Sequence, residues 1–192
     1  MKTTFVKAGL LALAMGVSAT AGAATFNYNY VEGGFGELDN DGDAFFLKGA
    51  KDLNPNWGLV GGLYFGDADP NIDFTAFEFG AQYHQPLKSN LSFHAGAQIL
   101  HVEVDFDHPV FGTKISDDDT GIIANAGLRF QVQPKFQLEG DVKFSSNDML
   151  PDDGLGLQIA ARFYIDPRLS IAGGVASDTE LDGLFVGLRY DL

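Results

Sequence analysis

The most constraining feature of this chain is an apolar side chain at every second position, repeated over segments of about ten residues. Phe77, Phe79 and Tyr83, for example, alternate with polar or small residues. The same alternation occurs in residues 57–65, 91–99, 122–132, 136–145, 155–165 and 184–192. A period of two puts successive side chains on opposite faces of a β-strand, whereas a helix requires a period of about 3.6. The sequence therefore predicts an all-β chain.

Two β architectures fit strands that have one apolar face. In a soluble sandwich the apolar face covers a packed core and the polar face meets water. In a transmembrane barrel the apolar face meets lipid and the polar face lines the interior. The alternation does not separate the two architectures, so the links between the strands have to decide.

Short and long links alternate along the chain. The short links contain Pro55, Pro86, Pro134 and Pro167. The long links cover residues 37–43, 67–73, 105–119, 146–153 and 178–182. Five long and four short links connect ten strands and place both termini on the side of the short turns. Because outer-membrane barrels have short periplasmic turns and longer external loops, the sequence predicts an antiparallel up-and-down transmembrane β-barrel of ten strands.

Aromatic residues mark both ends of the apolar faces. Trp57 and Phe65 bound one such face, and Phe136 and Phe144 bound another. Eight residues rise about 20 Å in a strand tilted by about 40°, close to the apolar band of about 25 Å that aromatic girdles flank in such barrels. We expect a girdle of Trp57, Phe65, Tyr83, Phe136, Phe144, Phe163 and Tyr190, joined by Phe26, Tyr28, Phe93, Phe130, Phe45 and Phe77.

Two stretches interrupt the alternation. If Tyr28 and Tyr30 face lipid, strict alternation puts Glu32 in lipid as well, which is costly for a carboxylate. This conflict predicts a β-bulge near residues 31–32 that turns Glu32 inward. After Ile99 the apolar residues shift to the even positions 100–106. Either a second bulge occurs there, or this hairpin projects above the membrane.

The first residues are typical of a secretory signal peptide. Lys2 and Lys7 precede an apolar stretch at 8–17, and Ala21-Gly22-Ala23 forms a small-residue cleavage pattern. The alternative is an uncleaved anchor, but the apolar stretch is short for a span of about 20 residues. We expect residues 1–23 to be a signal peptide and residues 24–192 to be the barrel of an exported protein. The chain contains no cysteine, which excludes disulfides and thiolate chemistry.

Charged residues at the inward positions are nearly balanced in sign. They are Lys48, Glu78, Arg129, Glu139, Asp141, Lys143, Arg162 and Arg189, with Glu32 and Asp191 beside them. Side chains largely fill barrels of about eight strands, and opposite charges inside them should pair. We therefore expect a polar network that fills the lumen. The alternative is a narrow pore whose charges select ions.

The formal net charge of −14 comes mainly from acidic residues in the long links. Such a balance disfavours nucleic-acid binding, which requires clustered basic residues. The segment Asp39-Asn40-Asp41-Gly42-Asp43 is similar to half of a calcium loop. However, Ala44 and Ala50 occupy the places of the loop glycine and of the bidentate glutamate. We expect no specific metal site, only weak binding of divalent cations at an anionic lipopolysaccharide surface.

The histidines do not form a recognisable catalytic motif. His84 and His94 flank the turn at 86–90, and His101 and His108 lie near Glu103 and Asp105. A rim enzyme needs a nucleophile or metal beside a histidine, and no such pairing is evident. We therefore expect no catalytic residues and no cofactor.

Taken with these patterns, the two ends of the barrel segment resemble a known family. The start, Tyr28-Asn29-Tyr30-Val31-Glu32-Gly33-Gly34-Phe35, and the end, Gly187-Leu188-Arg189-Tyr190-Asp191-Leu192, are similar to small outer-membrane β-barrels of Gram-negative bacteria. These include the OmpA transmembrane domain, OmpX and the opacity proteins. The likeness is strongest to a subfamily once described as quorum factors or immunity activators. Since many of these relatives have eight strands, eight is the alternative to ten.

The resemblance implies a location in the cell outer membrane and a C-terminal signal, Leu188, Tyr190 and Leu192, for the barrel-assembly machinery. Leu192 replaces the usual terminal Phe or Trp. The resemblance further implies a monomer that meets lipid, lipopolysaccharide and, during biogenesis, periplasmic chaperones. We expect a structural or surface-interaction role, such as adhesion or host contact through acidic external loops. A narrow porin-like channel is the first alternative, and a lipid-modifying enzyme at the rim is the second.

Overall fold

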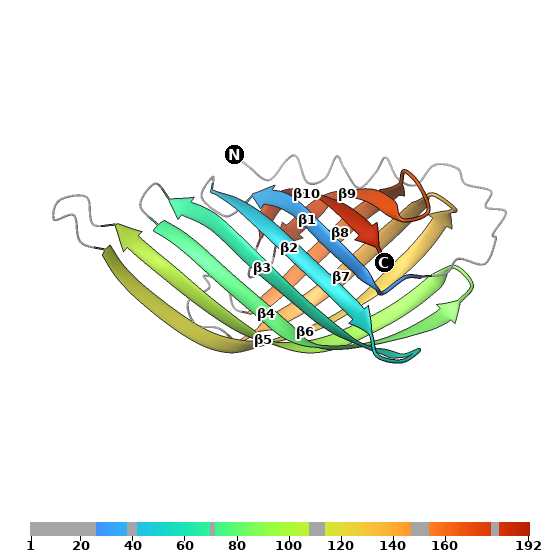
Figure 1. Ribbon diagram of the computed structural model, residues 1–192, viewed down its shortest axis with the longest axis horizontal. Helices are drawn as coiled ribbons and strands as arrows, with labels where there is room; N and C mark the ends of the chain where they lie inside the picture. The colour runs from blue at the N-terminus through green and yellow to red at the C-terminus, as the bar shows by residue number, and fades with distance from the viewer. Residues whose placement is uncertain (1–25, 38–41, 70–71, 108–113, 147–153, 178–180) are drawn as a thin grey trace.

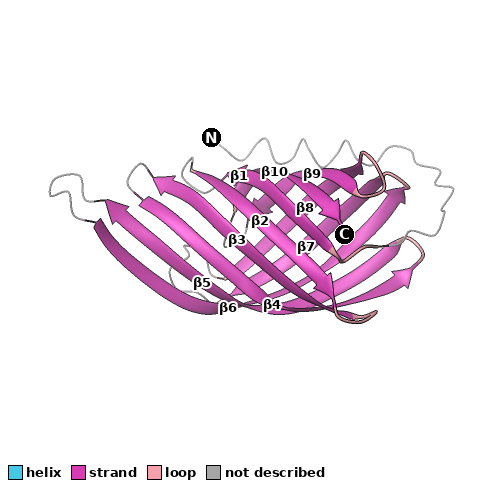
Figure 2. Ribbon diagram, viewed as in Figure 1, coloured by secondary structure: helices cyan, strands magenta, loops and turns pink. Residues whose placement is uncertain are grey.

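The computed structural model describes residues 26–37, 42–69, 72–107, 114–146, 154–177 and 181–192. Every regular element in these residues is a β-strand (Figure 2). None of them forms a helix that is long and apolar enough to cross a membrane. The strands are β1 (Tyr30–Glu37), β2 (Asp43–Asp52), β3 (Trp57–Asp69), β4 (Ile72–Lys88), β5 (Leu91–Asp107), β6 (Lys114–Gln133), β7 (Phe136–Ser145), β8 (Leu155–Tyr164), β9 (Leu169–Ser177) and β10 (Asp182–Asp191).

The strands form one closed barrel (Figure 1). Each strand pairs antiparallel with the next, and β1 pairs with β10 from Tyr30 opposite Asp191 to Gly36 opposite Phe185. The predicted ten-stranded up-and-down barrel is confirmed, and the eight-stranded alternative is wrong. Closure gives every strand a hydrogen-bonding neighbour on both sides, so that the sheet has no free edge along its paired length.

The barrel is apolar outside and polar inside. Its outer wall exposes bulky apolar side chains from every strand, among them Phe35, Phe79, Ile99 and Leu155. Its inner wall carries Glu78, Arg129, Arg162 and other buried polar side chains. An apolar surface this continuous is incompatible with water as the only solvent. The alternation of the sequence therefore corresponds to a lipid-facing wall rather than to a soluble sandwich.

The short turns and both described ends of the chain lie at one end of the barrel, at the right in Figure 1. Leu192 there donates its backbone N–H to the carbonyl of Asn29, over 2.9 Å. In the turn between β8 and β9, Asp166 Oδ1 accepts the backbone N–H groups of Arg168 at 2.8 Å and Leu169 at 2.9 Å. These hydrogen bonds hold the pKa of Asp166 below its ordinary value.

The strands extend further into two of the predicted long links than the sequence suggested. β3 continues to Asp69 and β4 begins at Ile72, and much of the predicted 105–119 loop belongs to β5 and β6. The hairpin of β5 and β6 reaches farthest to the left in Figure 1. The strands can continue into these acidic segments because the acidic side chains lie on the outer face, where they meet water, while alternate residues pack into the lumen. The first alternative for this region, a second bulge, is wrong, since the pairing around Ile99 shows no register shift. The projecting hairpin stays a prediction.

The predicted bulge near residues 31–32 is wrong. β1 keeps an unbroken register, with Glu32 opposite both Arg189 and Lys48. Glu32 faces the lumen because strict alternation continues, and Tyr30 lies on that same inner face. Tyr28, expected in the lipid-facing girdle, is buried at 3 % exposure. These rings cover guanidinium groups inside the barrel, which the sequence reasoning did not consider.

The outer part of the lumen contains an apolar core. Inward-facing side chains from eight strands meet there and exclude water, together with Leu181, which directly precedes β10. We call this group the outer apolar cluster; its members are Ala44, Phe46, Tyr64, Ala76, Leu100, Val102, Ile123, Ala160, Ala176, Leu181 and Phe185. It arises because the even positions of β5 become apolar beyond Ile99 without changing the face on which they lie.

Close packing around this cluster makes one glycine position sensitive to substitution. A Cβ atom on Gly34 would overlap the carbonyl oxygen of Val186 and lie 2.5 Å from Phe46 Cζ. We predict that Gly34→Ala lowers the free energy of unfolding by about 1–3 kcal/mol through overpacking. Urea unfolding followed by the fluorescence of Trp57 measures the loss. Gly140→Ala is the matched control, because nothing lies within 4 Å of a Cβ there. Equal stability of the two variants would contradict the packing argument.

Candidate functional site

The lumen near the short turns contains an ion-pair network centred on Arg162 of β8. Its Nη2 lies 2.9 Å from Glu32 Oε2, and its Nε lies 2.9 Å from Glu139 Oε1. Its Nη1 donates to Ser170 Oγ over 3.3 Å. One guanidinium therefore joins β1, β7 and β9 across the lumen. Such a group is suited to this role because its donors have a fixed planar geometry.

The same end of the lumen is crossed by residues 26–29, which we call the N-terminal segment. The carbonyl oxygen of Asn27 accepts from Arg189 Nη2 at 2.5 Å and from Arg129 Nη1 at 3.2 Å. The guanidinium carbon of Arg189 lies 3.8 Å from the centre of the Tyr30 ring. Arg189 Nε also lies 2.7 Å from Asp191 Oδ1. Two buried cations thus hold one backbone carbonyl and stack on adjacent aromatic rings.

Tyr28 fixes the N-terminal segment inside the barrel. Its ring stacks on His84 with a centroid distance of 3.9 Å, and its hydroxyl lies 2.8 Å from Ser92 Oγ. Next to it, Asn29 Nδ2 donates to Asp52 Oδ2 over 2.9 Å. Together with the contacts of Asn27, these bonds tie the segment to β2, β4, β5, β6 and β10. The segment therefore lies across the lumen at the end with the short turns.

His84 and His94, directly opposite each other on β4 and β5, do not form a shared site. His84 Nε2 lies 2.9 Å from Asp52 Oδ1, and His94 Nε2 pairs with Asp141. On β5, His101 Nδ1 lies 2.9 Å from Thr120 Oγ1. Among the described residues, no group of three or more His, Asp or Glu side chains could hold a metal ion. The half calcium loop at 39–43 lies mostly outside the described residues, as does His108.

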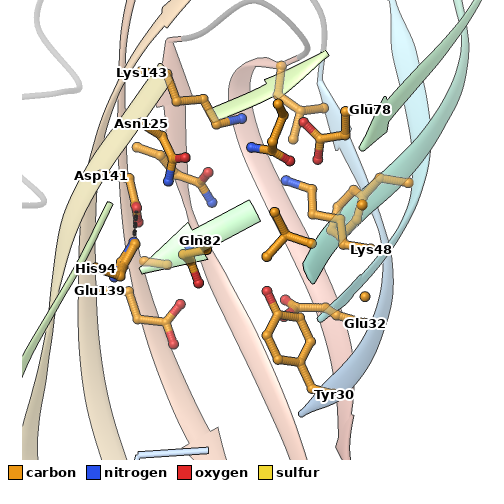
Figure 3. Close-up of a pocket in the computed structure, with 18 of the residues that line it drawn as sticks. Tyr30, Glu32, Lys48, Glu78, Gln82, His94, Asn125, Glu139, Asp141 and Lys143 are labelled. Atoms are coloured by element: carbon orange, nitrogen blue, oxygen red, sulfur yellow. Dashed lines mark hydrogen bonds and ion pairs between the residues drawn. The ribbon is translucent and has the colours of Figure 1, made fainter. Parts of the chain in front are cut away.

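Between the ion-pair network and the outer apolar cluster lies a polar cavity of about 110 Å³. Figure 3 shows Lys48, Glu78 and Lys143 pointing into it, with Gln82 and Asn125 on its wall. The hydroxyl of Tyr64 donates to Glu78 Oε1 over 2.9 Å. Lys48 Nζ lies over the Tyr64 ring at 5.1 Å. We call this cavity the polar chamber.

Acidic side chains are opposed in register on the outer face at the end with the longer links. Asp43 lies opposite Asp67, Asp67 opposite Asp73, and Asp73 opposite Asp105. Glu37 of β1 lies opposite Asp43 at the start of this row. Directly opposed like charges repel one another. Their summed field attracts cations to this surface.

Comparison with known proteins identifies the architecture. The sequence model of the family described as "Outer membrane protein beta-barrel domain" matches residues 9–163. The chain belongs to this family. It is 24 % identical over 171 residues to the attachment invasion locus protein of Yersinia enterocolitica, covering 78 % of this chain and 93 % of that protein. Its location is the cell outer membrane.

The solved structure of a porin shares the fold of this outer-membrane barrel. The KdgM porin superimposes with a TM-score of 0.51 at 10 % identity, covering 85 % of this chain and 99 % of the porin. The attachment invasion locus protein of Yersinia pestis gives a TM-score of 0.44 at 20 % identity, over 84 % of this chain and 93 % of that one. Because the chain belongs to the outer-membrane barrel family, its apolar outer wall faces lipid.

The predicted lumen residues all lie on the inner wall of the outer-membrane barrel, but the structure does not join all of them. Arg162 contacts Glu139, and Asp141 contacts His94. Within the described residues, Lys48 contacts ring faces and has no carboxylate partner. The predicted residues are Lys48, Glu78, Arg129, Glu139, Asp141, Lys143, Arg162 and Arg189.

Sequence reasoning missed the N-terminal segment and the outer apolar cluster. The even position of Glu32 was the available signal for the N-terminal segment. Tyr28 and Tyr30 are also at even positions, so they share the inward face of Glu32. The shift of the apolar residues to even positions after Ile99 was the signal for the outer apolar cluster.

Apart from Tyr28, which is buried in the lumen, the predicted girdle residues named in this paragraph lie on the outer wall of the barrel. Trp57 and Tyr83 meet edge to face, with ring centroids 5.3 Å apart, near the short turns. Phe35 and Phe45 make a similar pair, 5.4 Å apart, at the opposite end. The amphipathic rings of Trp57 and Tyr83 favour the interface between lipid and water. The remaining predicted members are Phe65, Phe136, Phe144, Phe163 and Tyr190.

We predict that removing Arg162 destabilises the barrel more than removing an exposed arginine. Arg162→Met leaves Glu32 and Glu139 buried without their cation, which should lower the free energy of unfolding by about 3–5 kcal/mol. The control, Arg168→Met in the turn between β8 and β9, should change it by less than about 0.5 kcal/mol. Adding Glu32→Gln and Glu139→Gln to Arg162→Met should restore much of the loss. Similar unfolding curves for both single variants would exclude the network as a stabilising element.

We also predict that Trp57 lies at the membrane interface. As the only tryptophan, it reports its own depth when lipids brominated at different chain positions quench its fluorescence. Bromine near the headgroup should quench it most. In the control Trp57→Phe/Phe79→Trp, the new tryptophan lies deeper, so bromine nearer the chain ends should be the stronger quencher. Identical depth profiles for the two proteins would contradict the girdle.

Proposed function

We propose that this protein is a non-conducting outer-membrane barrel that acts through contact, presenting an acidic outer surface for adhesion or host contact. The observation that carries the proposal is that the chain's own side chains occupy the lumen at both ends. The N-terminal segment lies at the short-turn end, and the outer apolar cluster lies toward the longer links. A barrel closed in this way has its outer surface, not its lumen, available for function.

The similarity to a protein named for attachment and invasion supports this role. The acidic row on β1 to β5 supports a partner that is positively charged or bridged by cations. Divalent cations could link these carboxylates weakly to the phosphates of lipopolysaccharide, because both are hard oxygen ligands. No catalytic or cofactor-binding residue is assigned in this proposal.

We further propose that the barrel is a monomer assembled by the general outer-membrane route. Leu188, Tyr190 and Leu192 would form the signal for the barrel-assembly machinery, after periplasmic chaperones have delivered the unfolded chain. Leu188 and Tyr190 alternate on the lipid-facing wall of β10, where such a signal would be read before closure. The proposed signal peptide, residues 1–23, lies outside the described residues.

A narrow channel is the second candidate function, favoured by the polar chamber and by the fold shared with the KdgM porin. Conductance of the refolded protein in planar bilayers separates the two. We predict no steady open channels, because apolar side chains at a constriction exclude water and ions. Steady channels in the unmodified protein would replace the contact role with a transport role.

We predict that adhesion depends on the outer acidic side chains. Bacteria that do not adhere, made to display the protein, should gain adhesion to cultured epithelial cells. The variant Asp73→Asn/Glu103→Gln/Asp105→Asn/Asp118→Asn should lose most of it, since all four side chains lie on the outer face of β4, β5 and β6. Asp166→Asn, in a short turn on the periplasmic side, is the control and should adhere normally. Undiminished adhesion of the fourfold variant would rule out this surface as the contact.

A further inference from the structure

Exposed basic side chains gather at the end of the barrel with the short turns, at the right in Figure 1. Among the residues whose side chains the structure describes, four Lys or Arg side chains are exposed, and each lies in or beside a different short turn. The remaining described basic side chains belong to the inner wall. We call the exposed group the basic rim; its members are Lys51, Lys88, Lys135 and Arg168.

Exposed apolar side chains accompany the basic rim. Leu53, Leu87 and Ile165 lie in or beside three of the short turns and are 63 %, 52 % and 50 % exposed. A basic side chain next to an apolar one suits a membrane interface, because the apolar side chain enters the lipid while the cation stays among the headgroups. The recurrence of this combination in three separate turns indicates that the turns lie at the membrane surface.

Aromatic rings lie beside the basic rim on two sides of the barrel. Arg168 Nη1 lies 3.5 Å from the hydroxyl oxygen of Tyr190, which stands on the outer wall of β10. Lys51 of β2 lies opposite Leu59, which shares the outer face of β3 with Trp57. Trp and Tyr rings are typical of the headgroup level of a bilayer. The basic rim therefore lies at the level of the lipid phosphates.

The basic rim is not neutralised by carboxylates of the same turns. Among the described residues of the short turns, Asp166 is the exposed acid, and its carboxylate already accepts two backbone N–H groups. Asp52 is held by Asn29 and His84. The field at this end of the barrel therefore attracts anions. The acidic row lies at the other end, so the two ends of the barrel have opposite charge.

We propose that the basic rim binds the phosphate groups of anionic phospholipids and so selects the lipids that surround the short-turn end of the barrel. Ammonium and guanidinium groups form charge-assisted hydrogen bonds with phosphate oxygens. A zwitterionic headgroup is bound less well, because it brings its own cation to a positive surface. Outer-membrane barrels have their short turns on the periplasmic side, so the partner is phospholipid of that leaflet rather than lipopolysaccharide. This binding is independent of the proposed adhesive role.

Quenching of Trp57 by brominated lipids tests the proposal locally, because this single tryptophan begins β3 at the short-turn end. The refolded protein is placed in phosphatidylcholine vesicles containing brominated phosphatidylglycerol or, in parallel, the same fraction of brominated phosphatidylcholine. We expect phosphatidylglycerol to be preferred around Trp57 by about fivefold, the effect of one cation near an anionic surface. Sodium chloride at about 1 M should remove the preference, since it shortens the screening length to about 3 Å.

Two matched variants separate the basic rim from the total charge of the protein. Lys51→Gln/Lys88→Gln removes the cations from β2 and β4, the two neighbours of β3, and should abolish the preference. The control, Lys135→Gln/Arg168→Gln, removes the same charge from turns farther round the barrel and should keep the preference. Heat-modifiable gel mobility shows that each variant is folded.

Three results would overturn the proposal. The first is equal quenching of the unmodified protein by the two brominated lipids. The second is a preference that survives in folded Lys51→Gln/Lys88→Gln. The third is an equal loss of preference in both double variants, since the total charge of the protein, and not the basic rim, would then attract the lipid.

Discussion

Closure of the sheet is the constraint on which this structure depends. Lipid offers no hydrogen bonds, so every backbone amide within the membrane must find a partner in a neighbouring strand. The register between β1 and β10 supplies the last set of partners, and it does so without a bulge. Once the sheet is closed, the alternation of the strands separates the side chains into a lipid-facing set and a lumen-facing set. The polar network, the chamber and the outer apolar cluster are all consequences of that separation.

The lumen is divided along its length by the chemistry of its side chains. Near the short turns, Arg162 and its two carboxylates make a dense ionic layer, with Arg129 and Arg189 beside it. In the middle lies the polar chamber, and toward the longer links the inner wall becomes apolar. The ionic layer tolerates burial because its charges are paired. The side chains of the apolar layer need no hydrogen-bond partners, so they fill this end of the lumen by packing alone.

The sequence predicted the barrel well because its evidence was repeated in nearly every strand. The number of strands and the inward position of Arg162 follow from local alternation and link length. The prediction that Pro86 lies in a link is wrong, because β4 continues through it to Lys88. The sequence predicted the contacts of the lumen poorly, because these depend on which strands face one another across the barrel. The tyrosines at 28 and 30 illustrate the limit: an aromatic ring at a strand end suits either a lipid interface or a guanidinium partner. Only the closed geometry, with Arg129 4.3 Å from the Tyr28 ring centre, selects the second.

The N-terminal segment has a consequence for the timing of folding. The carbonyl of Asn27 bonds with Arg189, which lies in β10, the last strand in chain order. These two partners are separated by almost the whole barrel sequence, so their contact cannot form until the chain has been delivered completely. A chain interrupted before β10 lacks both the seam and this bond. The N-terminal segment and β10 therefore secure each other, and neither is held in this way until both are in place.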